Sequence, residues 1–240
     1  MTARLTSRGL WAIAVAGVLT LGPWIAMFFV PNPNVNTDQA GYARAVTDAL
    51  HAIVGDLYII GLLCLLFGVV AISAWLQDTQ VRNDSVSPSR AAGIVRRAWH
   101  ASVSSYAMVG MVFGIVATAL VIGLWTILVF ATPTVGDVYL SGHPGAGEVF
   151  TVLSGGHWSA RMAPLFIVWA LAGLVAAFTL GDAIRRSGRV PKWVGPVFGF
   201  GFALSIASSP VVSLVGGLLL ILAGVMIARA ATQTTRSAAA

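Results

Sequence analysis

The sequence predicts an all-α, polytopic integral membrane protein: a bundle of six transmembrane helices with both termini in the cytoplasm. The first observation is composition, because hydrophobic residues make up 58% of the 240 residues and charged residues only 9%. A soluble domain carries about a quarter charged residues. The second is a mean hydropathy of +0.87. The third is the placement of the charges, which separate long apolar runs and collect on one side of the predicted membrane.

The first span is predicted at residues 10–30, which carry no charge over 21 positions. That length just crosses a hydrocarbon core of about 30 Å. Pro23 predicts a kink, and the sequence Pro-Asn-Pro-Asn at 31–34 ends the helix. Arg4 and Arg8 precede the run, so a signal peptide is the alternative. A span is favoured because the run exceeds a signal-peptide core of about 7–15 residues and no A-x-A cleavage site follows.

Three further spans are predicted at about residues 49–76, 101–130 and 162–182. The run 101–130 holds 30 uncharged residues, which is more than the hydrocarbon core requires, so this helix should tilt or protrude. Residues 131–161 then form an outer loop of 31 residues with six glycines.

The last apolar stretch, residues 193–228, is 36 residues long, or about 54 Å as one helix. Ser208, Ser209 and Pro210 stand where a turn is required. We therefore predict a hairpin of two spans, 193–207 and 210–228, with a re-entrant half-helix at 193–207 as the alternative. Residues 1–230 then form a single six-helix domain, followed by a disordered cytoplasmic tail at 231–240.

The charges test this topology by the positive-inside rule. Twelve of the 14 basic residues and three of the eight acidic residues fall on the side of the termini. That side carries +9 and the other −3, which together make the net charge of +6. The excess of basic residues is thus explained by topology, and no nucleic-acid partner is expected. Thirteen of the basic residues are Arg, a bias typical of GC-rich bacterial genomes, so we expect a bacterial cytoplasmic membrane.

Ionisable residues gather on the outer side, and those within a membrane are costly enough to suggest function. Asp56 lies about one and a half turns inside the second span, and His51 and His157 stand near the outer starts of two spans. We predict a catalytic group of Asp56, His51 and His157. The predicted substrate-binding residues nearby are Glu148, His143, Trp158 and Arg161.

Three interpretations of this outer cluster stay open. In the first, Asp56 caps a helix or pairs locally with Arg44 or Arg161. In the second, Asp56 is a general acid or base in an outward-facing pocket, and the histidines orient a substrate. In the third, the histidines bind haem, or His51, His143 and Asp56 surround zinc; no H-x-x-x-H or H-E-x-x-H spacing favours that site.

No cofactor is expected. The single cysteine, Cys64, excludes an internal disulfide or a cysteine-based metal cluster. The sequence also has no Walker A loop, dinucleotide-binding glycine motif or G-x-S-x-G elbow. Gly110-x-x-x-Gly114 and Gly195-x-x-x-Gly199 have a spacing that lets helices approach closely, although 26 glycines also produce such pairs by chance.

The string Ser187-Gly188-Arg189-Val190-Pro191-Lys192-Trp193-Val194-Gly195 precedes the last hairpin. It resembles an SG-x-[VL]-P-[RK]-[WF]-[VL]-G string in a large bacterial family of small polytopic membrane proteins, a domain of unknown function. The resemblance implies about six helices and no assigned activity. The chain is also similar, more weakly, to small helical membrane cyclases that protonate terpenoid substrates with embedded acids.

These observations favour a membrane scaffold or a binder of lipid-like small molecules with an outward-facing pocket. The expected partners are membrane lipid, a lipophilic small molecule and a second copy of the chain. The alternative is a membrane-embedded isomerase or cyclase that uses Asp56 as general acid or base on a terpenoid or lipid. A transporter comes third, because we find no repeat between the first three and last three spans.

Overall fold

The computed structural model describes the backbone of all 240 residues except 1, 30–32, 34–36, 84–89, 150–155, 208–209 and 238–240. Side chains are also left undescribed at 2–7, 27, 78–83, 90–101, 156–161, 210 and 234–237. The described residues are helical, with turns between the helices and no strand. The helices are α1 (Thr2–Met27), α2 (Gln39–Thr47), α3 (Ala49–Asn83), α4 (Arg90–Leu140), α6 (Gly156–Ser187), α7 (Val194–Ser205) and α8 (Pro210–Ser237).

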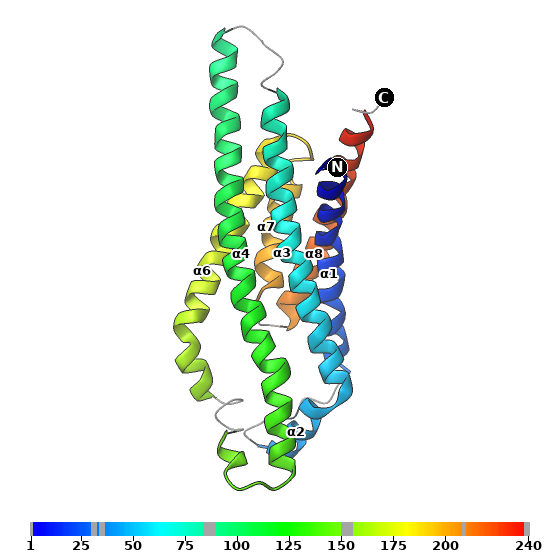
Figure 1. The fold of residues 1–240 in the computed structure, drawn as a ribbon, viewed down its shortest axis with the longest axis vertical. Coiled ribbons are helices and arrows are strands. Elements are labelled where there is room, and N and C mark those ends of the chain that lie inside the picture. The colour runs from blue at the N-terminus through cyan, green and yellow to red at the C-terminus, as the bar shows by residue number, and fades with distance from the viewer. Residues whose placement is uncertain are drawn as a thin grey trace.

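The long helices run side by side as one elongated bundle (Figure 1). Each contacts its neighbours in a closed ring, in the order α1, α3, α4, α6, α7, α8 and back to α1. The start of α1, the end of α8 and the connection between α6 and α7 lie toward the same end of the bundle (Figure 1). We call it the basic end, because that connection and the last turn of α6 carry Arg185, Arg186, Arg189 and Lys192. The short helix α2 lies at the opposite end, which the sequence predicts to be the outer one.

Within the described residues, five helices are long and apolar enough to cross a membrane. Their apolar segments are Arg8–Ala26, Ala49–Gln77, Ser102–Leu140, Met162–Ser187 and Val211–Gln233. The chain is therefore an all-helical protein of the multi-pass membrane type, as predicted.

Helix α7 is the exception among the predicted spans. It has 12 residues and a length of about 18 Å, which is short of the roughly 30 Å of a hydrocarbon core. It packs between α6 and α8 toward the basic end (Figure 1). One face of α7 nevertheless belongs to the core, since Phe198 and Phe202 are completely buried. The predicted segment 193–207 thus contains a partly buried helix that is shorter than an ordinary span.

The predicted outer loop at 131–161 is wrong at both ends. Helix α4 continues through Pro133 to Leu140, and α6 already begins at Gly156. Tertiary packing explains the first extension, because Val135 and Tyr139 pack against Ala43 and Val46 of α2. The sequence pattern of 131–140 contains no signal of this contact, since the partner helix α2 lies far away in the sequence.

Helix α8 also extends beyond the prediction, as far as Ser237. The described backbone is therefore helical, and not disordered, from residue 231 to Ser237. The extension begins with Ala230 and Ala231, which favour helix, and Ala231 is buried. The helix continues because one of its faces still has a packing partner.

Candidate functional site

His51 lies half-buried on α3 and lines a cavity of about 30 Å³. The lining also includes three aromatic residues from three helices, Trp24, Tyr58 and Trp125. Their ring centroids lie 4.6–5.7 Å apart, so the rings pack against one another as a core. A cavity of this size has room for about one water molecule, and it could not enclose a lipophilic substrate.

Asp56 lies on the same helix, and its side chain is exposed. It follows His51 by five positions, which turns it about 140° around a helix of 3.6 residues per turn. The two side chains therefore face different sides of α3. The sequence placed both in the outer part of the second span, but position along a helix does not fix the face on which a side chain lies.

The length of α3 indicates how deep Asp56 lies. The apolar segment of α3 has 29 residues, or about 43 Å, whereas a core of about 30 Å needs about 20 residues. Counted back from Gln77, about 20 residues end at Tyr58. Asp56 then lies just outside the hydrocarbon core, where its carboxylate can reach water.

Among the described side chains, no ion pair joins the other predicted outer residues to Asp56. His143 and Glu148 are exposed on the connection beyond α4, where His143 lines an open hollow. Arg44 is exposed on α2, and no ion pair between it and Asp56 is present among the described side chains. The side chains of His157, Trp158 and Arg161 lie outside the described residues. Within the part of the chain that is described, no three His, Cys, Asp or Glu side chains are grouped to hold a metal.

Asp38 and Asp48 cap helices, and neither had a predicted role. The Asp38 carboxylate accepts a hydrogen bond from the Gly41 amide at 2.8 Å, at the start of α2. The Asp48 carboxylate accepts one from the Leu50 amide at 2.7 Å, at the start of α3. Such caps satisfy amide groups that have no partner within the helix, so these two acids have a structural use.

A larger hollow lies between α6 and α7, with a volume of about 260 Å³; we call it the α6–α7 groove. It is lined by Leu174, Ala177, Phe178, Gly181, Asp182, Arg185, Pro196, Gly199, Phe200 and Ala203. Phe178 and Phe200 are 71% and 63% exposed and form part of its wall, whereas the glycines and alanines leave space between the helices. The groove is therefore an apolar slot on the outside of the bundle.

Glycines bring the two helices into backbone contact beside this groove. A Cβ atom at Gly199 would lie 2.6 Å from the Ala177 carbonyl oxygen, and one at Gly181 would lie 2.9 Å from the Gly195 carbonyl oxygen. Such contacts leave no room for a side chain. The Gly195-x-x-x-Gly199 pair noted in the sequence is thus used for close helix packing, and Gly181 is the partner that spacing could not reveal.

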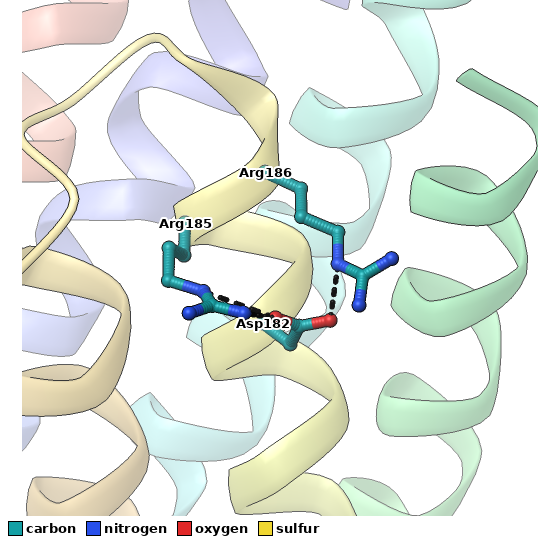
Figure 2. Close-up of polar contacts among 3 residues, drawn as sticks. All are labelled: Asp182, Arg185 and Arg186. Carbon is teal, nitrogen blue, oxygen red and sulfur yellow. Dashed lines mark hydrogen bonds and ion pairs between the residues drawn. The ribbon is translucent and has the colours of Figure 1, made fainter. Parts of the chain in front are cut away.

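Asp182 and Arg185 lie at one end of the α6–α7 groove, and Figure 2 shows their contacts together with Arg186. Asp182 accepts hydrogen bonds from Arg185 Nη2 at 2.6 Å and Nε at 3.1 Å. Arg186 Nε pairs with the other oxygen of the same carboxylate. The Arg185 side chain is 51% exposed and that of Asp182 is 20% exposed. Ion pairs this accessible contribute little stability, so their main effect is to hold the Arg185 guanidinium at the end of the groove.

Other cations at this end are fixed on aromatic rings. The Arg186 guanidinium lies 5.0 Å from the Tyr106 ring centroid, and that of Arg189 lies 4.8 Å from the Trp75 ring centroid. Arg189 Nη1 also donates a hydrogen bond to the Trp75 carbonyl at 2.9 Å. Fixed basic side chains therefore lie beside the end of the groove that Arg185 and Asp182 line. The positive-inside pattern explained these arginines by topology alone and did not indicate a site.

Comparison with models of protein families, with curated proteins and with solved structures found no match.

Proposed function

We propose that the chain is a six-pass protein of a bacterial cytoplasmic membrane that binds an anionic phospholipid in the α6–α7 groove. The observation that carries this proposal is the continuity of the groove, whose apolar walls lead directly to Asp182 and Arg185. A phospholipid matches this arrangement, because its apolar acyl chains are attached to a charged headgroup.

The charge distribution supports the orientation. The last turn of α6 and the connection to α7 lie toward the end of the bundle where α1 begins and α8 ends, and they carry Arg185, Arg186, Arg189 and Lys192. Short basic segments are retained in the cytoplasm, so we place this end inside. The groove then opens to the inner leaflet, where anionic lipids attract basic residues. This location differs from the outward-facing pocket that the sequence favoured.

We place α7 in the membrane as a short sixth segment, which forms a hairpin with α8. Irregular backbone inside a membrane is tolerated where it is buried in protein and its polar groups have partners. The end of α7 meets this requirement, because Tyr58 donates to the Ser205 carbonyl and Ser213 donates to the Ala207 carbonyl.

Arg185 is suited to receive the lipid phosphate. A guanidinium carries five N–H groups and binds phosphate with two parallel hydrogen bonds. Arg185 uses Nε and Nη2 on Asp182, so N–H groups remain for a second anion. Further along the groove from Arg185, the small residues Ala177, Gly199 and Ala203 leave a slot that an acyl chain can occupy.

Native mass spectrometry in mild detergent tests this proposal with equal amounts of phosphatidylglycerol and phosphatidylcholine of identical chains. We expect preferential retention of phosphatidylglycerol, a loss of that preference in Arg185→Gln, and loss of both bound lipids in Ala203→Trp, which fills the slot. Arg8→Gln is the matched control, because Arg8 is exposed on α1 at the same end. Equal retention of both lipids by the unmodified protein, or an equal effect of the two arginine variants, would contradict the proposal.

A further inference from the structure

Asp182 is the one acid among the residues that line the α6–α7 groove, and it lies beside the arginine that we assign to the lipid phosphate. A carboxylate at this place is unexpected, because it repels the anionic headgroup of the lipid. Its contacts with Arg185 and Arg186 show how an acid and a phosphate can share the site, and which headgroups the acid would admit.

The Asp182 carboxylate occupies one edge of the Arg185 guanidinium. Its Oδ1 atom accepts hydrogen bonds from Nε at 3.1 Å and from Nη2 at 2.6 Å. A guanidinium is a planar group with five N–H bonds. Since Nε and Nη2 both point toward one oxygen, Nη1 lies on the side away from Asp182 (Figure 2). The edge formed by Nη1 and Nη2 can therefore still give a phosphate two parallel hydrogen bonds.

The carboxylate is held from both sides. Its other oxygen pairs with Nε of Arg186, whose guanidinium lies over the Tyr106 ring of α4. Figure 2 shows the two arginines on opposite sides of Asp182. The Arg185 side chain is also much more exposed than that of Asp182. A lipid phosphate can thus approach Arg185 without displacing Asp182, and we expect both anions to contact the same guanidinium.

Asp182 lowers the positive charge that a headgroup meets. Two guanidinium cations and one carboxylate give these three residues a net charge of +1. The phosphodiester of phosphatidylglycerol carries one negative charge, whereas the phosphomonoester of phosphatidic acid carries about two above a second pKa near 6. The additional charge would share the Arg185 guanidinium with the Asp182 carboxylate, where like charges repel each other.

We propose that Asp182 sets the headgroup specificity of the α6–α7 groove: it admits a lipid with one phosphodiester charge and disfavours a lipid that ends in a phosphomonoester. The proposal rests on the phospholipid site described above and names the lipid class that this site selects. Asp182 acts through Arg185, as a positioning residue and a fixed negative charge.

Native mass spectrometry at pH 8 in mild detergent tests this specificity with equal amounts of phosphatidylglycerol, phosphatidic acid and phosphatidylcholine of identical chains. The unmodified protein should retain more phosphatidylglycerol than phosphatidic acid. Asp182→Asn removes the charge and keeps an oxygen that can accept from Arg185. The ratio of retained phosphatidic acid to phosphatidylglycerol should therefore rise roughly three- to tenfold, as for loss of one charge repulsion near water. Asp182→Glu keeps the charge and should keep the original ratio.

Asp137→Asn is the matched control, because Asp137 is exposed on α4 outside the groove and its replacement changes the net charge equally. The ratio should not change in this variant. The accessible ion pairs of Asp182 contribute little stability, so the unfolding midpoint of Asp182→Asn should stay close to that of the unmodified protein.

Two kinds of result would overturn the role of Asp182 and leave the phospholipid site intact. The first is a ratio that is unchanged in Asp182→Asn, or that rises equally in Asp137→Asn. The second is stronger retention of phosphatidic acid than of phosphatidylglycerol by the unmodified protein. Equal retention of all three lipids would instead overturn the phospholipid site, and the specificity with it.

Discussion

The Tyr58 hydroxyl donates a hydrogen bond to the main-chain carbonyl of Ser205 at 3.1 Å. The two residues are 147 positions apart in sequence and join the buried face of α3 to the last turn of α7. A carbonyl in the last turn of a helix has no amide partner within that helix. Tyr58 therefore supplies the partner that allows α7 to end inside the bundle.

Tyr58→Phe is expected to destabilise the fold by about 1–3 kcal/mol, because the Ser205 carbonyl stays buried and loses its partner. Tyr58 is only 2% exposed, so water would not readily replace the hydroxyl. The measurement is thermal or denaturant unfolding in mild detergent. Tyr106→Phe is the control, since Tyr106 is 38% exposed and should have little effect. Equal stability of Tyr58→Phe and the unmodified protein would show that the bond does not support α7.

The glycine contact between α6 and α7 gives a second prediction. Gly199→Ala places a methyl group 2.6 Å from the Ala177 carbonyl oxygen, so the helices must separate, and we expect a loss of about 1–3 kcal/mol. Gly22→Ala is the matched control, because a methyl group at Gly22 meets no atom within 4 Å. An unfolding midpoint of Gly199→Ala equal to that of Gly22→Ala would contradict the close packing.

The helices were predictable because a transmembrane span is specified by local composition. The predicted spans near 49–76 and 162–182 closely follow the apolar segments Ala49–Gln77 and Met162–Ser187. The predictions that were wrong concerned segments whose structure depends on contacts with residues distant in the sequence. The end of α4 packs on α2, and nothing within residues 131–140 indicates that partner.

The candidate site was less predictable for a related reason. In a membrane both the lipid-facing and the buried sides of a helix are apolar, so the pattern does not show which way a side chain points. Asp56 is exposed and His51 is half-buried on the same helix, although their positions suggested a shared site. The role of Asp56 as a general acid or base therefore stays a prediction, and no described contact favours it.

The orientation of the bundle predicts labelling by a membrane-impermeant maleimide. In a Cys64→Ser background, Lys192→Cys places a thiol at the basic end and Ser141→Cys places one beyond the outer end of α4, both at exposed positions. We expect Ser141→Cys to react in intact cells and Lys192→Cys to react only after the membrane is opened. If Lys192→Cys reacted in intact cells and Ser141→Cys only after the membrane is opened, the topology would be the reverse of the proposed one.

The contact between α2 and α4 predicts a dependence of stability on pH. Burial raises the pKa of Tyr42 above its ordinary value near 10. The unfolded phenol therefore ionises first, and its contribution to stability is present below pH 10 and lost as the pH rises above that value. Tyr42→Phe should reduce the loss of stability between pH 9 and 11, measured by unfolding in buffered detergent. Parallel pH profiles for the two proteins would exclude this effect.

The most direct test of phospholipid binding is an experimental structure of the protein in a bilayer that contains phosphatidylglycerol. We predict elongated density in the α6–α7 groove between Phe178 and Phe200, ending in a phosphate within about 3 Å of the Arg185 guanidinium, a normal hydrogen-bond distance. A groove closed by its own side chains, or a lipid whose headgroup lies away from Arg185, would contradict the proposed function.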